Sequence, residues 1–197
     1  ETVRNVIARN CAAEGIMLDT NRNSSVSDCQ AWNCRVGLFL NGNDDWRTRG
    51  SDNVTATRFK TDSQITCWQV NDFALSNIEM DCTKAASSYG FVVRDGNGTI
   101  KNSILKSDPT KASSYGGATY ITKKARVLLE ACRVEGYFGI HAVGKSYAEA
   151  KNCQIVAPGG CYCTKDPNPV SSTIVARGCT WSGKKSDLKE GSSLVEA

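Results

Sequence analysis

The sequence has no long apolar run and no long basic run. No stretch reaches about 18 uncharged apolar residues, so no membrane insertion is expected. The 24 basic and 20 acidic residues are interspersed and leave a net charge of +4, which argues against a nucleic-acid partner. The chain opens at Glu1 with neither a Met nor the apolar segment of a signal peptide. We therefore expect a processed or excised fragment.

Signatures of common catalytic and metal sites are also missing. The single histidine, His141, has no G-x-S-x-G serine motif to work with, so a structural role is favoured for it over catalysis. Among the ten cysteines, Cys161 and Cys163 form one close pair. Neither a second close pair nor a histidine completes zinc-finger spacing. We predict no metal site and no cofactor.

What the sequence does contain is a repeat of two alternating blocks. The first block reads apolar, any residue, Asn or a small residue, and then an anchor that is often Cys. Its anchors are Cys11, Cys29, Phe59, Ile78, Ser103, Cys132, Cys153 and Cys179. The second block reads Gly, apolar, any residue, apolar. Its copies begin at Gly15, Gly37, Gly90, Gly139 and Gly160, with looser copies at Gln64 and Gly117.

The spacing and periodicity of these blocks predict the fold. Most anchors follow the preceding second block by about 14 residues, and apolar residues alternate within each block, which indicates short strands. Such repeats are typical of a β-solenoid, because each coil buries its inward side chains only by stacking on its neighbours. We predict an all-β, right-handed parallel β-helix of about seven to eight coils over residues 1–182, and a polar C-terminal tail over 183–197.

Stacking places equivalent residues above one another. The anchors form one inward column, and a second inward column contains Ile16, Leu38, Ile65, Phe91, Ala118, Ile140 and Cys161. All cysteines but Cys34 and Cys82 fall on inward columns, so we interpret them as reduced packing residues rather than disulfides. Reduced thiols suit assembly in a reducing cytosol. The Asn residues before the anchors are predicted to form a turn ladder: Asn10, Asn77, Asn102 and Asn152.

The Gly-apolar-x-apolar and Asn-Cys or Asn-Ile blocks resemble the parallel β-helix repeats of the pectin-lyase-like superfamily over about residues 5–182. That superfamily includes pectate lyases, polygalacturonases and phage tailspike depolymerases. The resemblance is strongest to a tailspike segment and implies a surface polysaccharide as partner, a homotrimer, and a place on a virion tail. A secreted protein is the alternative. The clustered Asp motifs of polygalacturonases are not evident in this sequence.

Insertions interrupt the repeat at two corners. Residues 41–53 and 164–172 lengthen one corner, and residues 83–89 and 107–116 lengthen another. The last two insertions repeat each other, so that Lys84 and Tyr89 match Lys111 and Tyr115. Two exposed tyrosines beside two lysines suit an anionic glycan, and we predict substrate binding by these four residues. The alternative is that the two loops brace each other.

One outward column lies three residues past the anchors and carries Glu14, Trp32, Asp62, Asp81, Lys106 and Glu135. Asp62 and Asp81 would lie about 5 Å apart on adjacent coils. Two carboxylates at that spacing are the arrangement of a retaining glycosidase, so we predict them as the catalytic pair, with Trp32 and Lys106 binding substrate. The alternative is two solvated acids at strand ends, with Lys106 as their counter-charge.

A further outward set follows the Gly blocks. It contains Met17, Phe39, Thr66, Val92, Thr119, His141 and Tyr162, and then Asp19, Asn41, Trp68 and Arg94. Exposed aromatic and apolar side chains on a flat sheet predict either a carbohydrate platform or a subunit interface. The interface fits Met17, Phe39 and Val92 better, because these side chains have no polar group.

Together these patterns predict a carbohydrate-binding β-helix that depolymerises polysaccharide, with hydrolysis and β-elimination both open. The alternative is a non-catalytic, structural or receptor-binding trimeric segment. A calcium-dependent lyase comes third, since Asp44, Asp45 and Asp52 are the only loose candidates for its site.

Overall fold

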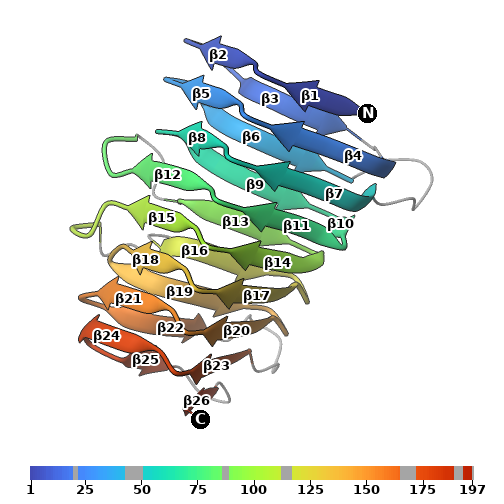
Figure 1. Ribbon diagram of the computed structural model, residues 1–197. Coiled ribbons are helices and arrows are strands. Elements are labelled where there is room, and N and C mark those ends of the chain that lie inside the picture. The colour runs from blue at the N-terminus through green and yellow to red at the C-terminus, as the bar shows by residue number, and fades with distance from the viewer. Residues whose placement is uncertain are drawn as a thin grey trace.

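The computed structural model describes residues 1–19, 22–42, 51–85, 89–111, 117–164, 172–188 and 193–196. Every regular element in these ranges is a β-strand, and no helix long and apolar enough to cross a membrane occurs among them. The strands stack in parallel into a β-solenoid, with the two termini at opposite ends (Figure 1). The predicted all-β parallel β-helix is confirmed.

The strands form three sheets, which we name A, B and C, and every ladder between neighbouring strands is parallel. Sheets A and B lie at the front of Figure 1, and sheet C lies behind them. Sheet A has ten strands: β1 (Thr2–Arg4), β4 (Arg22–Ser27), β7 (Ser51–Thr57), β10 (Val70–Asn71), β11 (Phe73–Ser76), β14 (Asn97–Lys101), β17 (Arg126–Glu130), β20 (Tyr147–Lys151), β23 (Thr173–Arg177) and β26 (Ser193–Glu196).

The other two sheets have eight strands each. Sheet B contains β2 (Ile7–Arg9), β5 (Gln30–Trp32), β8 (Lys60–Thr61), β12 (Glu79–Cys82), β15 (Ile104–Ser107), β18 (Arg133–Glu135), β21 (Gln154–Ala157) and β24 (Thr180–Gly183). Sheet C contains β3 (Glu14–Asp19), β6 (Val36–Asn41), β9 (Gln64–Trp68), β13 (Phe91–Arg94), β16 (Gly117–Thr122), β19 (Phe138–Val143), β22 (Gly160–Thr164) and β25 (Ser186–Leu188).

The ladders continue beyond residue 182. β25 pairs with β22, and β26 pairs with β23, so both strands extend the solenoid in a segment where the sequence predicts a polar tail. The strands there are short and carry few large apolar residues, which is why periodicity did not reveal them.

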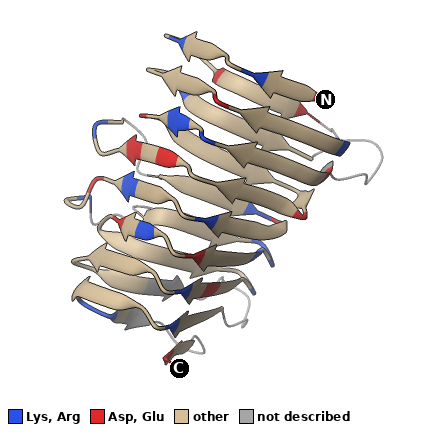
Figure 2. Cartoon of the chain, in the orientation of Figure 1, with Lys and Arg blue, Asp and Glu red and all other residues tan. Residues whose placement is uncertain are grey.

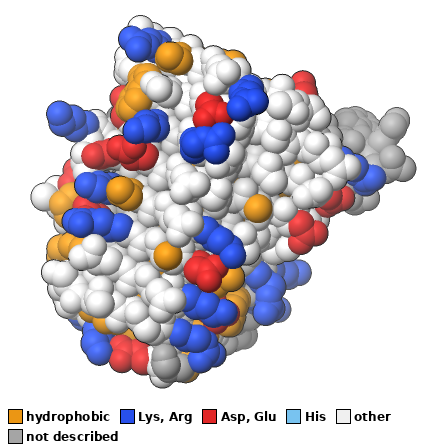
Figure 3. Space-filling model, viewed as in Figure 1, with side chains coloured by type: hydrophobic (Ala, Val, Ile, Leu, Met, Phe, Trp, Pro, Cys, Tyr) orange, Lys and Arg blue, Asp and Glu red, His pale blue; other side chains and the backbone are white. Residues whose placement is uncertain are grey.

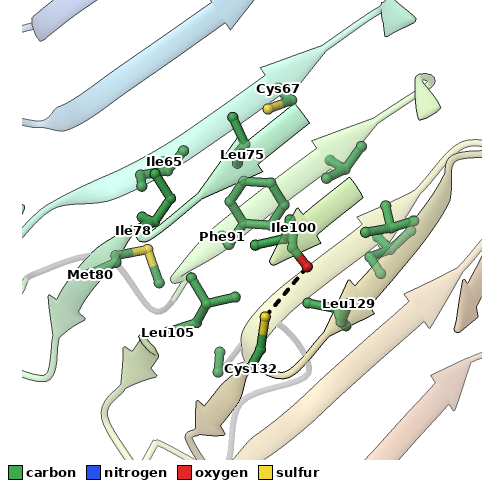
Figure 4. Close-up of a cluster of buried hydrophobic side chains, with 14 of the residues drawn as sticks. Ile65, Cys67, Leu75, Ile78, Met80, Phe91, Ile100, Leu105, Leu129 and Cys132 are labelled. Carbon is green, nitrogen blue, oxygen red and sulfur yellow. Dashed lines mark hydrogen bonds between the residues drawn. The ribbon is translucent and has the colours of Figure 1, made fainter. Parts of the chain in front are cut away.

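A single column of apolar side chains fills the interior. Phe59, Phe73 and Phe91 are fully buried, and the rings of Phe73 and Phe91 meet edge to face with centroids 6.2 Å apart. Side chains from successive coils interdigitate in this column (Figure 4). Burying each such side chain stabilises the fold by about 1.5–3 kcal/mol, so the coils hold together mainly through this core.

A left-handed residue turns the chain between sheets A and B in each coil. Asn77, Asn102 and Asn152 take φ angles of 55°, 50° and 52° there, as the predicted turn ladder requires. Asn10 is the exception, because it lies at the corner between sheets B and C. At that corner Asn33 Nδ2 donates a hydrogen bond to Asn10 Oδ1 over 2.8 Å.

Cys11 is displaced from its predicted column for the same reason. The register Ala8↔Ala31 places its block in sheet B, at the start of the Asn10 corner, so Cys11 lies near Cys34. The counterpart of Cys29 in the first coil is Val6, whose amide donates to Cys29 Sγ over 3.4 Å. Both corners use an Asn followed by a Cys, and the sequence pattern alone does not distinguish them.

The anchors do more than fill space. The thiols of Cys29, Cys132 and Cys153 donate to the carbonyl oxygen two residues earlier, over 3.1, 3.4 and 3.4 Å. The Ser103 hydroxyl makes the same bond to Lys101 over 2.7 Å. Each of these carbonyls also accepts from a backbone N–H of the preceding coil, so a small side chain with one donor adds a second hydrogen bond at the corner.

Cys82, which the sequence placed off the inward columns, is 1% exposed and belongs to the core. Burial raises the pKa of the Cys82 thiol to about 12, and burial also raises the pKa of the Cys67 thiol. Thiols in such surroundings stay protonated and unreactive. The other buried cysteines in the described ranges are Cys29, Cys132, Cys153 and Cys161.

Candidate functional site

The outer face of sheet C carries most of the set that the sequence predicts; the side chain of Tyr162 lies outside what the structure describes, and one assignment is corrected. Thr119 is fully buried and its hydroxyl donates to the Gly139 carbonyl over 3.1 Å. Tyr120 takes the outward place, in register with Val92 on one side and His141 on the other. The sequence pattern therefore puts the block Gly117-Ala118-Thr119-Tyr120 one residue out of register. In the structure Thr119 and Ile121 are the residues of this strand that point inward.

A hollow of about 290 Å³ lies on this face, and we name it the sheet C hollow. It is lined by Gln64, Tyr89, Val92, Arg94, Tyr120, Thr122 and Lys123. β9, β13 and β16 supply most of these residues from three successive coils. Tyr89 comes from the end of the 83–89 insertion, and its ring centroid is 5.0 Å from that of Tyr120. Two tyrosine rings therefore form one wall.

A second group of aromatic side chains continues from the hollow along sheet C. The Arg94 guanidinium lies 4.5 Å from the centroid of the Trp68 ring. Trp68 in turn stacks on Phe39 with centroids 6.5 Å apart. The cation–π contact fixes Arg94 against the sheet without neutralising its charge.

The hollow is electropositive. Among the described residues, Arg94 and Lys123 are the only charged ones that line it, and no acidic residue in these ranges forms an ion pair with either. Nearby cations without counter-ions raise the local concentration of anions. The arrangement can therefore hold an anionic group next to a tyrosine wall.

His141 lies next to this wall, on the adjacent coil and in register with Tyr120. It is 1% exposed, and its ring packs against Tyr120 and Phe138 with centroids 4.9 and 5.9 Å away. Burial lowers the pKa of His141 to about 3, so the imidazole is neutral at pH 7. Its burial suits the structural role that the sequence favours, since its ring packs against the ring of Tyr120.

The predicted catalytic pair lies on sheet B. The register Thr61↔Met80 makes Asp62 and Asp81 neighbours on adjacent coils. Asp62 Oδ1 accepts from the backbone N–H of Asn33 over 2.9 Å and from the Ser63 hydroxyl over 2.8 Å. Asp81 Oδ1 accepts from the hydroxyl and amide of Thr83 over 2.6 and 3.2 Å.

These bonds give both carboxylates a role in ending strands, as Asp commonly has at turns. Catalysis by the pair stays a prediction. Glu14 is not part of their column, because it pairs with Val36 in sheet C, and Arg9 lies above Trp32 instead.

The remaining predicted binding residues are dispersed. Trp32 is half-buried on sheet B and donates to its neighbour Gln30 over 3.0 Å, and Lys106 pairs with Glu135 over 3.4 Å. Lys84 is exposed at the start of its loop. Tyr115 lies outside the described residues, as do Asp44 and Asp45. Of the described members of the predicted set, Tyr89 is the one that lines the sheet C hollow.

Lys111 joins the two similar loops. Its ammonium group donates to the Ala85 carbonyl over 3.0 Å and lies 3.8 Å from Asp108. This contact favours the alternative in which the loops brace each other. Asp52, the described member of the loose calcium candidates, pairs with Arg22 at 3.8 Å. The described residues hold no cluster of three metal-ligating side chains.

Four lining residues were not selected from the sequence: Gln64, Tyr120, Thr122 and Lys123. Tyr120 could have been found by setting the frame of its block from Ile121, which alternates with Thr119. Lys123 and Gln64 carried no signal of their own, because they become neighbours only when three coils stack.

No protein-family model matches the sequence, and no curated protein matches it with significant similarity. The fold defines the chain as a parallel β-solenoid. Its resemblance to the pectin-lyase-like superfamily therefore rests on the repeat pattern.

Proposed function

We propose that this solenoid binds an acidic polysaccharide through the sheet C hollow. The observation that carries the proposal is the tyrosine wall of Tyr89 and Tyr120 beside two cations that have no acidic partner among the described residues. Aromatic rings bury the apolar face of a sugar ring, and nearby donors fix its polar groups. Arg94 and Lys123 are placed to receive the carboxylate of an acidic sugar.

The shape of the hollow supports binding to part of a long chain. Its volume of about 290 Å³ is at the lower end of the range for small-molecule sites, about 300–1,000 Å³. It is open along a sheet rather than closed. Such a site suits a short segment of a polysaccharide that continues over the neighbouring coils. On this proposal the chain is a binding solenoid of the tailspike type, and its ligand is a cell-surface glycan.

The test is calorimetric titration with tetragalacturonate as the acidic probe and maltotetraose as the neutral one. Lys123→Gln should weaken tetragalacturonate binding about fivefold, while Lys145→Gln should leave it unchanged. Lys145 is the matched control, because it is an exposed lysine with left-handed backbone at the same corner and does not line the hollow. Equal affinity of the wild type for the two probes would overturn the proposal.

Depolymerisation is a separate proposal, carried by Asp62 and Asp81 on sheet B. The wild type should release reducing ends or unsaturated products from polygalacturonate, and Asp62→Asn and Asp81→Asn should each lose this activity. Full activity in both variants would exclude the pair. Binding at the sheet C hollow does not require either carboxylate.

A second candidate function is that of a structural trimeric segment. Met17 is 42% exposed and lies in register with Phe39 on sheet C, and neither side chain has a polar group for a glycan. An exposed apolar column of this kind suits contact with another copy of the chain. Sedimentation as a trimer that Met17→Lys dissociates would support this function, and a monomer at all concentrations would contradict it.

A further inference from the structure

A larger hollow, of about 590 Å³, lies on the outer face of sheet A. It begins at the corner where sheet C passes into sheet A, and it crosses β11, β14, β17 and β20. We name it the sheet A hollow. The lining residues that matter for its chemistry are Asp72, Asn97, Thr99, Arg126, Leu128 and Tyr147.

Two glycines bring neighbouring coils close together along this hollow. Gly96 and Gly98 line it without side chains. A Cβ atom at Gly98 would lie 2.3 Å from the carbonyl oxygen of Phe73 and 2.4 Å from its ring, so the close approach of these two coils requires glycine. The next coils bring the long side chains of Arg126 and Tyr147 to the same edge, and these form the far wall.

The near wall is an oriented pair of polar groups. Asn97 Nδ2 donates to Asp72 Oδ1 over 3.0 Å, which fixes the amide and the carboxylate relative to each other. The second carboxylate oxygen of Asp72 and the amide oxygen of Asn97 remain as acceptors. Adjacent acceptors of this kind match the adjacent hydroxyl groups of a sugar ring.

The far wall is also held in place. The Arg126 guanidinium lies 5.0 Å from the centroid of the Tyr147 ring, and the Tyr147 hydroxyl donates to Glu149 over 3.3 Å. Burial alone would raise the pKa of Glu149, but the hydrogen bond from Arg177 and the charge of Lys151 outweigh it and hold this pKa below its usual value. The wall is thus ordered before any ligand arrives, which reduces the entropic cost of binding.

The charges of the sheet A hollow nearly cancel. Its lining has the acids Asp72, Asp95 and Glu149 and the bases Lys124 and Arg126, and Glu149 is already paired with Arg177 at 3.1 Å. The sheet C hollow, by contrast, has bases only. A balanced set of donors and acceptors favours a ligand that is polar but uncharged.

We infer that the sheet A hollow is a second saccharide site, which takes an uncharged, hydroxyl-rich segment of a glycan. Asp72 and Asn97 accept hydrogen bonds from the hydroxyl groups of the sugar ring. Arg126 donates hydrogen bonds to the hydroxyl oxygens. Leu128 and Tyr147 contact the apolar side of the sugar. This site does not depend on the sheet C hollow.

Saturation-transfer NMR with maltohexaose, cellohexaose and N-acetylchitohexaose tests the inference. At least one of these neutral probes should receive saturation from the wild type. Thr99→Trp, which fills the hollow, should abolish the transfer. Thr57→Trp is the matched control, because it places the same substitution on the same face of sheet A outside the hollow, and it should keep the signal.

Because Thr99→Trp could disturb folding, a milder substitution provides a second test. Asp72 has a φ of 55°, which Asn tolerates, so Asp72→Asn should fold and should bind the neutral probe about tenfold more weakly. No transfer to any probe, or equal transfer in the wild type and Thr99→Trp, would overturn the inference.

The two proposals can fail separately. Tyr120→Ala and Lys123→Gln should not affect binding of the neutral probes. If the wild type fails to bind tetragalacturonate but still binds a neutral probe, only the sheet C proposal is refuted.

Discussion

Charge is organised differently on the front face of the solenoid and around the sheet C hollow. On sheets A and B, opposite charges face each other in register across neighbouring strands, as in Lys60–Glu79 at 2.6 Å and Lys101–Glu130 at 2.7 Å. Figures 2 and 3 show Lys and Arg beside Asp and Glu on this face. Around the sheet C hollow, Arg94 and Lys123 have aromatic neighbours instead of acids.

This difference separates charges that serve the fold from charges that are available to a ligand. An exposed ion pair stabilises a protein by only about 0–1 kcal/mol, but it keeps neighbouring strands from repelling each other and leaves the surface near neutrality. Arg94 and Lys123 have no acidic partner in the part of the chain that the structure describes, so they give the fold no such benefit. Their position beside two tyrosines is what points to recognition on sheet C.

The largest expected effect comes from the core beneath sheet C. Phe91→Ala should lower the free energy of unfolding by about 3–5 kcal/mol, because the side chain is fully buried and its loss leaves a cavity. Val92→Ala, one residue away on the outer face, should cost less than about 1 kcal/mol. Urea unfolding of both variants measures the contrast. Similar losses would mean that the inward and outward assignment of β13 is wrong.

Removing one aromatic ring from sheet C and one from sheet B shows which of the two sheets binds the glycan. Tyr120→Ala should weaken tetragalacturonate binding about tenfold, which corresponds to about 1.4 kcal/mol. Trp32→Ala, on sheet B, should not change the affinity, although the sequence predicts Trp32 as a binding residue. A larger loss for Trp32→Ala would move the site to sheet B, next to Asp62.

A smaller effect is expected from the ion pairs. Lys60→Gln should lower the free energy of unfolding by less than about 1 kcal/mol, since its pair with Glu79 is exposed. It should leave glycan binding unchanged. Thermal unfolding and the calorimetric titration check the two expectations. A clear loss of binding would show that the paired face also contacts the ligand.

The smallest effect concerns Asp28, which Arg58 contacts through two hydrogen bonds of 2.5 and 2.9 Å. These bonds and the charges of Arg58 and Arg4 lower the pKa of Asp28 to about 2 in the folded protein. The unfolded value is about 3.9, so the stabilisation is present above about pH 4 and is lost as the pH falls towards 2.

Asp28→Asn tests this linkage. Asn suits the left-handed backbone of this position, where φ is 56°. The difference in Tm between the wild type and the variant should be largest above pH 4 and should shrink between pH 4 and pH 2. A difference that stays constant over this range would show that the ion pair does not stabilise the fold.

Much of the fold could be predicted because the repeat has a physical cause. Stacked coils need alternating apolar residues and a left-handed residue at the corner, and both requirements are visible in residues such as Asn77 and Phe91. The assignments failed where one pattern serves two corners, as at Cys11, or where a copy is out of frame, as at Thr119. The strands after residue 182 carried too weak a pattern to be recognised.

The candidate site was less accessible from sequence. Tyr89 was found because insertions stand out against a repeat, but the sequence paired it with Tyr115. Tyr120 is its neighbour in the structure, and that contact depends on how three coils stack. The sheet A hollow could not be found from sequence, since its lining residues come from several successive coils and meet only when these coils stack.

The central claim is that an acidic saccharide binds at the sheet C hollow, and Trp68 is a reporter inside this region. A carboxylate at the hollow should draw the Arg94 guanidinium from the Trp68 ring, which it contacts at 4.5 Å, and so alter tryptophan emission. Titration with tetragalacturonate should give a saturable change in the wild type that is absent in Trp68→Phe, while calorimetry still detects binding to that variant. The same change in both proteins, or none in the wild type when calorimetry shows binding, would contradict the account.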